Sequence, residues 1–432
     1  MAVVRFGRGA NAPFGGERFL SQPGRIAPRE CEGLFTVIAS AAKQSISPRK
    51  GRMDCFVASL LAMTRISRRY TFSVIARLDR PIQYSRAIRD RIEKPQRTGC
   101  PTFAGHEKMT SPDLPAELKA ALDAKLEGLS RRDTAGRAAL ISQTYRGGGG
   151  SGAIKSETDA LAYALARMPA TYAAIVASLN ALSDIRPEFA PASLLDIGAG
   201  PGTATWAAAE VFPSLQECTL LDANDALRSL ALDLVRKSAR LRGVTYEPGQ
   251  ARSLVAHAEA ADIVIASYMI GEIGDAERTA LADWMWAKTR DTLLVVEPGT
   301  PAGYARIIAL REQLIADGAH VAAPCPHDGK CPLSAPDWCH FTQRLQRLRA
   351  HKQVKGAELP FEDEKFAYVA LARAPVAKHS ARVLAQPDVT KVEVSAKLCT
   401  PAGLAVTKVP RRAKADYARA RRWRWGGAVE WP

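Results

Sequence analysis

Three alternating glycines interrupt an apolar run near the middle of the chain. The run 193–197 leads into Gly198, Gly200 and Gly202, and helix-forming residues follow from Thr203. Glycine lets a backbone turn sharply and approach a ligand closely, and the first amides of the following helix have no partner within it. The stretch therefore predicts a strand, a tight turn and a helix that together bind a nucleotide-like cofactor.

Two carboxylates indicate which cofactor this turn would bind. Asp196 lies two residues before the first glycine, where its charge would repel a pyrophosphate but attract the ammonium and sulfonium groups of S-adenosylmethionine. Asp222 ends the next apolar run, where a carboxylate can accept both ribose hydroxyls. The G-x-G-x-G spacing also differs from the G-x-G-x-x-G of dinucleotide sites. We predict S-adenosylmethionine, with Gln250 and Ala251 beside its adenine; the alternative is a strand-to-helix turn without a ligand.

Four cysteines in the second half of the chain have a spacing that suits a metal site. They are Cys325, Cys331, Cys339 and Cys399, in the pattern C-x5-C-x7-C-x59-C. The first three fall in a proline-rich stretch with few core-forming residues, which cannot fold by apolar burial alone, and four thiolates suffice for one four-ligand site. Gaps wider than those of zinc knuckles favour a [4Fe–4S] cluster. Zinc and metal-free cysteines are the alternatives, and His327 and His340 are either substitute ligands or ordinary loop residues.

The glycine turn needs a sheet to hold it, and further apolar runs predict one. Strands are expected at 219–221, 244–246, 263–267 and 292–297, with helix-forming stretches between them. Such alternation predicts a parallel sheet whose strand carboxyl ends surround one cleft. With the glycine turn and its acids, the pattern resembles class I methyltransferases, which have an α/β, Rossmann-like fold.

Helical periodicity precedes this sheet, and strand-like alternation follows it. Apolar residues three and four apart predict a helix over 114–129, then two more on either side of Pro169, over 157–169 and 170–182. Alternation over 381–409 predicts a small β extension that carries Cys399. The expected organisation is a helical region at 109–189, a methyltransferase-like core at 190–375 that includes the cysteine loop 324–341, and a β extension with a basic Arg/Trp tail at 376–432.

The first 108 residues differ from the rest of the chain. They hold 20 of the 60 Lys and Arg residues but only 8 of the 44 Asp and Glu residues, and they lack sustained periodicity. Segments such as Met53–Thr64 resemble conceptual translations of DNA repeats that are interspersed in bacterial genomes. We expect residues 1–108 to be disordered or spurious, with Met109 as the true initiator. A basic nucleic-acid arm and an organellar transit peptide are the alternatives.

Composition narrows the class of protein. The chain is 47% hydrophobic, and no apolar run approaches eighteen residues, so we expect a globular protein without a membrane span. No secretory signal is recognisable, which favours reduced cysteines. We expect a cytoplasmic protein if the source is bacterial and a mitochondrial one if it is eukaryotic.

Several motifs together resemble one protein family. They are Arg167–Tyr172 (RMPATY), Leu195–Thr203 (LDIGAGPGT), Val296–Thr300 (VEPGT), Cys325–Pro332 (CPHDGKCP) and Asp337–Phe341 (DWCHF). They are similar to the methyltransferase-like assembly factors of the small ribosomal subunit, found in bacteria and mitochondria, and the likeness covers residues 109–432. The resemblance implies a class I methyltransferase fold, a [4Fe–4S] cluster on the four cysteines and association with small-subunit rRNA.

The residues after the fourth predicted strand can be compared with the motif that amino-methylating enzymes carry there. Amino-methylating enzymes commonly carry N/D-P-P-Y/F there, whereas this chain reads Ser267–Glu272 (SYMIGE), in which Tyr268 or Glu272 could line a pocket or simply pack. We predict an S-adenosylmethionine-dependent protein acting on the small subunit through rRNA methylation, assembly or both, with no catalytic residue assigned. The alternative is a non-catalytic, rRNA-binding assembly factor. The tail 411–425 interleaves arginines with aromatic residues, which is typical of RNA contact, or forms a solvated basic helix.

Overall fold

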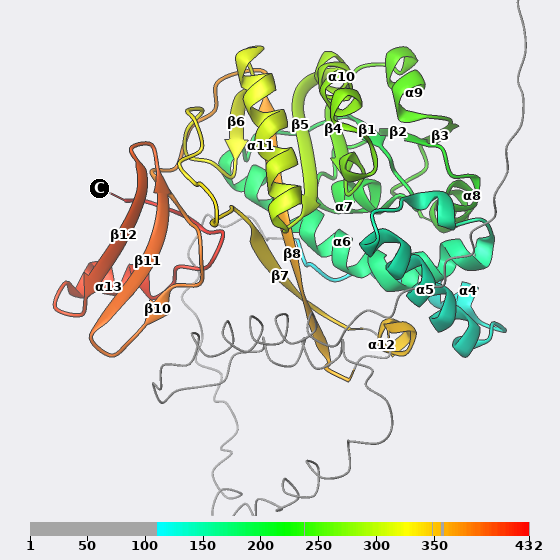
Figure 1. Ribbon diagram of the computed structural model, residues 1–432, viewed down its shortest axis with the longest axis horizontal. Coiled ribbons are helices and arrows are strands. Elements are labelled where there is room, and N and C mark those ends of the chain that lie inside the picture. The colour runs from blue at the N-terminus through cyan, green and yellow to red at the C-terminus, as the bar shows by residue number, and fades with distance from the viewer. Residues whose placement is uncertain (1–109, 237, 348, 356–357, 432) are drawn as a thin grey trace, which may run out of the picture. The chain divides into compact units, whose positions relative to one another are not determined.

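A computed structural model gives the fold of residues 110–431, except for 237, 348 and 356–357 (Figure 1). The expectations for residues 1–108 and for Met109 as initiator lie outside the described residues. The bounds of the expected helical region, core and extension stay predictions.

An eight-stranded sheet holds the glycine turn. Its order is β3-β2-β1-β4-β5-β8-β6, and β7 pairs with one end of β8. The strands are β1 Ser193–Ile197, β2 Glu217–Asp222, β3 Val244–Pro248, β4 Ala261–Ser267, β5 Thr289–Pro298, β6 His320–Ala323, β7 Phe341–Gln346 and β8 Phe361–Ala372. β1 to β5 are parallel, and β8 runs antiparallel to β5, β6 and β7. This doubly wound order with one antiparallel strand near its edge is a class I methyltransferase-like α/β fold.

Helices cover both faces of this sheet (Figure 1). The helices on the sheet are α6 Glu157–Ile185, α7 Thr203–Val211, α8 Asp225–Val235, α9 Ala251–His257, α10 Asp275–Ala287 and α11 Pro301–Ala316. Three more, α4 Ala116–Leu126, α5 Arg131–Arg146 and α12 Arg349–Lys355, pack against α6. Leu194 packs in the layer of α6 to α8, and Leu195 packs in the layer of α9 to α11. Because both faces are covered, the central strands are continuous apolar runs, which is why the sequence revealed them. The predicted strands are confirmed, with β2, β3, β4 and β5 longer than expected.

The structure has one helix where the sequence predicted two. α6 continues through Pro169, which lies buried inside it. Proline removes a backbone donor and often kinks or ends a helix, but tertiary packing can override that preference. Here Ala170 and Ala173, just after the proline, pack against Leu345 of β7. The prediction of a break at Pro169 was therefore wrong.

α6 is also long and apolar enough to cross a membrane by length and composition. However, 83% of its most apolar window is buried inside the protein. Its hydrophobicity is that of a central core helix, which is apolar on all sides.

A second, antiparallel sheet lies beside the β6 and α11 end of the main sheet (Figure 1). Its strands are β9 Ala381–Val383, β10 Asp388–Val389, β11 Glu393–Thr400, β12 Gly403–Pro410 and β13 Ala428–Val429, and α13 Lys414–Ala420 follows β12. The order is β10-β11-β9-β13, with β12 on the other edge of β11. One of its apolar clusters has only five buried residues, Ala381, Val383, Ala396, Leu398 and Val429. So small a core makes attachment to the rest of the chain important for stability.

Candidate cofactor and metal sites

Hydrogen bonds hold the glycine turn against the neighbouring strands β2 and β3. Gly198, Gly200 and Gly202 all have left-handed φ angles, of 67°, 53° and 79°, which favour glycine over any residue with a side chain. The amide of Gly198 donates to the carbonyl of Leu221 at 2.8 Å, and the Tyr246 hydroxyl donates to the carbonyl of Gly200 at 2.9 Å. The turn is therefore held in place at the carboxyl end of β1, and it carries side chains only at Ala199 and Pro201.

Asp196 lies fully buried beneath this turn. One carboxylate oxygen accepts hydrogen bonds from the Thr205 amide at 3.1 Å and the Thr205 hydroxyl at 2.7 Å, so it caps the first turn of α7. The other oxygen has no hydrogen-bond partner among the residues that the structure describes. Burial is the main cause that raises the pKa of Asp196 to about 7, with a smaller contribution from the charge of Asp222 and against the lowering effect of the hydrogen bonds from Thr205. An unpartnered buried carboxylate oxygen suits a cationic ligand, because a positive charge would stabilise the ionised form.

This raised pKa predicts that the ligand-free protein loses stability as pH rises. The native pKa of Asp196 lies above that of an unfolded aspartate, about 3.9, so the native state binds more protons between pH 4 and 7. The stability present at pH 4 should fall by up to about 4 kcal/mol by pH 8. The Asp196→Asn protein should lack this part of the decline. Urea unfolding at pH 5 and pH 8 measures the free energy of unfolding of both proteins. An equal change in that free energy between the two pH values in both proteins would contradict the prediction.

Asp222 stands at the end of β2, next to the turn. Its carboxylate accepts the Gly200 amide at 2.9 Å and the Asn224 amide at 2.8 Å, and a carboxylate retains further lone pairs for a ligand hydroxyl. Gln250 lies exposed just after β3, and Ala251 begins α9. The structure thus places all seven predicted cofactor residues at the carboxyl edge of the sheet; among the contacts above, only the hydrogen bond from Gly200 to Asp222 joins two of them.

Residues 147–155, which we call the cover segment, cross the sheet edge above the glycine turn. The Asn224 side chain, after β2, donates to the carbonyls of Ser151 and Ile154, both at 2.9 Å. Glu272, after β4, accepts the Ser151 amide at 2.9 Å. Because β1 lies between β2 and β4, a segment bonded to residues beyond both strands must pass over the carboxyl end of β1.

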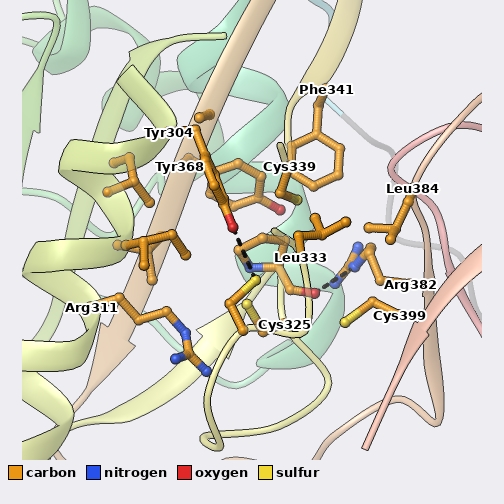
Figure 2. A pocket seen from close by; sticks show the side chains of 16 residues that line it. Tyr304, Arg311, Cys325, Leu333, Cys339, Phe341, Tyr368, Arg382, Leu384 and Cys399 are labelled. Carbon is orange, nitrogen blue, oxygen red and sulfur yellow. Dashed lines mark hydrogen bonds between the residues drawn. The ribbon is translucent and has the colours of Figure 1, made fainter. Parts of the chain in front are cut away.

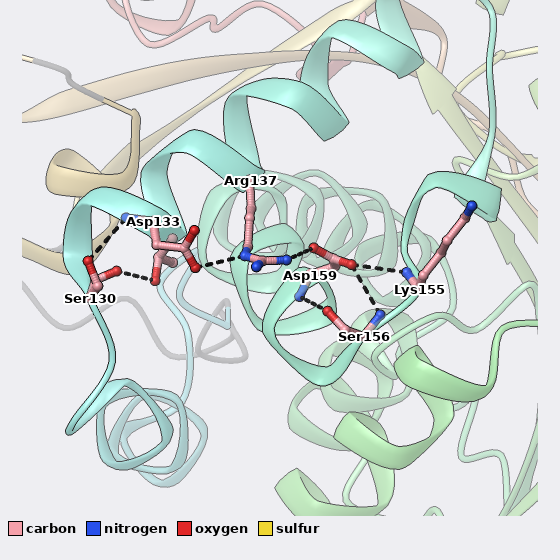
Figure 3. Close-up of polar contacts among 7 residues, drawn as sticks. Ser130, Asp133, Arg137, Lys155, Ser156 and Asp159 are labelled. Atoms are coloured by element: carbon pink, nitrogen blue, oxygen red, sulfur yellow. Dashed lines mark hydrogen bonds and ion pairs between the residues drawn. The ribbon is translucent and has the colours of Figure 1, made fainter.

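The end of the cover segment is anchored at the start of α6 (Figure 3). Ser156 and Asp159 form a capping box, in which each side chain accepts the backbone amide of the other. Asp159 also accepts the Lys155 amide at 3.2 Å and pairs with Arg137 of α5 at 2.7 Å. Arg137 in turn bonds Asp133 at 2.8 Å. Because this end of the cover segment is held in place, its hydrogen bonds with the side chains of Glu272 and Asn224 are the ones that must break if the segment opens.

We expect the Glu272→Ala protein to exchange cofactor faster than the unchanged protein. Loss of the bond to Ser151 should raise both the association and dissociation rates of S-adenosylmethionine severalfold, with a smaller change in affinity, because a loop closed over a site limits entry and release. Stopped-flow fluorescence measures both rates. The matched control is Glu277→Ala on the exposed side of α10. Unchanged rates in Glu272→Ala would rule out a gating role.

The side chains that follow β4 have partners inside the protein. Tyr268 has a left-handed φ of 56°, which is strained for a bulky residue, and its hydroxyl donates to Glu364 at 3.1 Å. Arg167 pairs with the same carboxylate at 3.5 Å. Glu297, at the end of β5, is buried and pairs with Arg306 at 2.7 Å. These contacts hold the side chains at the carboxyl ends of β4 and β5 in place, and they identify no general base.

The four predicted metal ligands line one cavity, between the main sheet and the second sheet (Figure 2). It holds about 500 Å³ of empty space, including the part open to solvent. Cys325, Cys331 and Cys339 come from the loop between β6 and β7, and Cys399 comes from β11. Residues up to 74 positions apart in the sequence are thus brought to one place by the packing of the second sheet.

The thiols are in surroundings that disfavour free thiolates. Burial raises the pKa of Cys325 and Cys339, and it raises that of Cys399 to about 12. The neighbouring cysteines contribute to the raised pKa of Cys339 and Cys399, because nearby thiolates repel one another. Among the described residues, no three Cys, His, Asp or Glu side chains form a group that could hold a single metal ion. The four thiols therefore line the cavity without forming a metal-binding group in this structure.

The sequence pattern missed several residues of this cavity. The Tyr304 hydroxyl lies 3.2 Å from Cys331 Sγ, and the side chains of Arg311 and Arg382 also line the cavity. No motif marked them, since they come from α11 and β9. Of the two candidate histidines, His327 has its Nε2 3.6 Å from Cys399 Sγ, whereas His340 stacks on Trp338 with ring centres 5.0 Å apart.

The basic tail is partly folded against the second sheet. Its exposed cations are Arg411, Arg412, Lys414, Arg419, Arg421, Arg422 and Arg424. Its aromatic residues are engaged: Tyr417 donates to the Thr390 carbonyl at 2.7 Å, Trp423 packs edge-on to Trp431, and Trp425 donates to the His340 carbonyl at 2.8 Å. The surface therefore offers cations rather than free rings.

Comparisons with solved structures return methyltransferases at low similarity. Magnesium protoporphyrin IX methyltransferase from Synechocystis with bound S-adenosylmethionine is 10% identical, with a TM-score of 0.33, over 63% of this chain and all of that one. A putative RNA methyltransferase from Pyrococcus horikoshii is 12% identical, with a TM-score of 0.32, over 46% of this chain and 83% of that one. Scores this low carry no argument about the site, so the fold assignment rests on the strand order.

Sequence comparison finds closer relatives. The human mitochondrial ribosome assembly protein METTL17 is 30% identical over an alignment of 291 residues that covers 63% of this chain and 62% of that protein. A mitochondrial Rsm22-cox11 tandem protein of Schizosaccharomyces pombe is 25% identical over an alignment of 325 residues that covers 63% of this chain and 43% of that protein. The chain thus spans less than two thirds of either relative. The family model described as mitochondrial small ribosomal subunit Rsm22 matches residues 157–431, which include the glycine turn and all four cysteines, so the chain belongs to the Rsm22 family.

Proposed function

We propose that the chain is an assembly factor of the small ribosomal subunit that binds S-adenosylmethionine and a [4Fe–4S] cluster. The observation that carries the cofactor part is the glycine turn, which has three left-handed glycines above an unpartnered oxygen of Asp196 and beside Asp222. The assembly role rests on membership of the Rsm22 family and on the similarity to METTL17.

The donor set supports the cluster. Four thiols surround one cavity, and thiolates are the ligands of [4Fe–4S] clusters. A cluster places its inorganic core between the thiolates, and ligation would displace the protons that burial keeps on them. When bound, it would supply a cross-link between the cysteine loop and β11.

Contact with rRNA would fall on the exposed cations of the tail. Phosphate neutralisation needs accessible Lys and Arg side chains, and the tail presents seven. The aromatic residues beside them are occupied in packing, so this proposal rests on phosphate contacts rather than on base stacking.

Methyl transfer to rRNA is the second candidate function, favoured by the intact glycine turn. The decisive experiment is to purify small-subunit particles from a deletion strain and to map their rRNA for lost methyl groups. Accumulated immature particles with every methyl group present would support the non-catalytic alternative; a single lost methyl group, restored by the gene, would establish the enzyme. Normal particles and normal methylation would refute both. The mitochondrial names of the relatives favour the mitochondrial location and give the cytoplasmic one no support.

A further inference from the structure

Two buried arginines flank the four-cysteine cavity. Arg311 of α11 is 1% exposed and Arg382 of β9 is 5% exposed, and both line the cavity. In the view of Figure 2 they lie on opposite sides of Cys325. Burying a guanidinium is costly unless an opposite charge compensates for it.

Neither arginine has an acidic partner within the part of the chain that the structure describes. The Arg311 side chain donates to the carbonyls of His327 and Gly329, at 2.9 Å and 2.8 Å, and its Nε atom has no partner. Arg382 donates to the carbonyls of Pro324 and Gly426, at 2.7 Å and 2.8 Å. These bonds satisfy N–H groups, but neutral carbonyls leave both positive charges without a counter-charge.

We infer that Arg311 and Arg382 are the counter-ions of the metal–thiolate group that the four cysteines hold. This inference rests on the proposed cluster. Four thiolates bring four negative charges, and a [4Fe–4S] core with two positive charges leaves a net charge of minus two. Two guanidinium groups balance that charge. A cluster that accepts one electron becomes more negative, so both arginines stabilise the reduced form more than the oxidised form.

The arginines also position the loop that carries the ligands. Arg382 bonds the residue directly before Cys325, and Arg311 bonds two carbonyls between Cys325 and Cys331. Charge and loop geometry can be separated by substitution. Lysine keeps the charge but loses the fork of donors, whereas glutamine keeps a donor and loses the charge.

The test compares Arg311→Gln, Arg382→Gln and the two lysine variants, all purified anaerobically as the full chain. In each glutamine variant the equilibrium constant for one-electron reduction of the cluster should fall at least tenfold. A tenfold fall lowers the reduction potential by about 59 mV. The lysine variants should retain a cluster of nearly normal potential. Arg373→Gln is the matched control, because Arg373 also donates to a backbone carbonyl, that of Thr289 at 2.9 Å, and lies outside the cavity. Iron and sulfide content and the potential are the readouts.

The outcomes distinguish charge from geometry. Loss of the cluster in the glutamine variants with retention in the lysine variants also supports the inference. Unchanged potential and iron content in both glutamine variants would overturn it, and so would equal cluster loss in the lysine and glutamine variants, which would assign the arginines to loop geometry alone. Absence of iron and sulfide from the unchanged protein would instead refute the proposed cluster itself.

Discussion

Replacing Cys399 with serine is expected to remove the brown absorbance of the anaerobically purified protein. Cys399 is the one cavity cysteine that comes from the second sheet. Changes to residues that merely support a metal ligand cost about 10-fold to 100-fold in metal affinity, so loss of a ligand should cost at least as much. Because the second sheet has a small core, its strands should also exchange amide hydrogens faster.

Loosening of the second sheet should be partial. Arg382 still bonds the Pro324 carbonyl, and Lys397 still pairs with Asp337 at 2.6 Å. The glycine turn lies outside the cavity, so the Cys399→Ser protein should bind S-adenosylmethionine normally. Cys218→Ser is the matched control, since Cys218 is buried in β2 and does not line the cavity. Full iron content in the Cys399→Ser protein would show that Cys399 is not a cluster ligand. Stoichiometric zinc without iron or sulfide in the unchanged protein would exclude the cluster.

The second large effect is expected for Gly200→Asp, which should abolish binding of S-adenosylmethionine. Gly200 has a φ of 53°, and its amide donates to Asp222. An added carboxylate would strain the turn, occupy the surface that the cofactor must approach and repel Asp222. We expect affinity to fall at least 100-fold, or about 2.8 kcal/mol, in calorimetric titration.

A matched control separates these effects from backbone strain. Gly318 has a φ of 88° and no atom near the position of an added side chain, and it lies after α11. Gly318→Asp should therefore carry a similar strain and leave cofactor affinity unchanged. Gly200→Ala should bind more weakly than the unchanged protein and more tightly than Gly200→Asp. Unchanged affinity in Gly200→Asp would mean that the turn does not hold the cofactor.

The sequence by itself determined the parts that depend on local order. Strands buried on both faces are continuous apolar runs, so β1 to β5 could be recognised without a partner strand. The G-x-G-x-G turn could be predicted because only glycine tolerates three left-handed φ angles so close together. The four cysteines could be nominated as ligands because thiolate chemistry belongs to the residue type.

Only the tertiary structure decided which distant residues meet. Glu272 and Ser151 are 121 positions apart, and no local pattern links them. Pro169 predicts a helix end by its own chemistry, yet packing against β7 keeps α6 continuous. Arg311 and Arg382 look like ordinary surface cations in the sequence, because burial depends on how α11 and β9 pack around the cysteine loop. Local interactions decide the turn and the strands, while long-range packing decides the cover segment, the cavity and the charge around it.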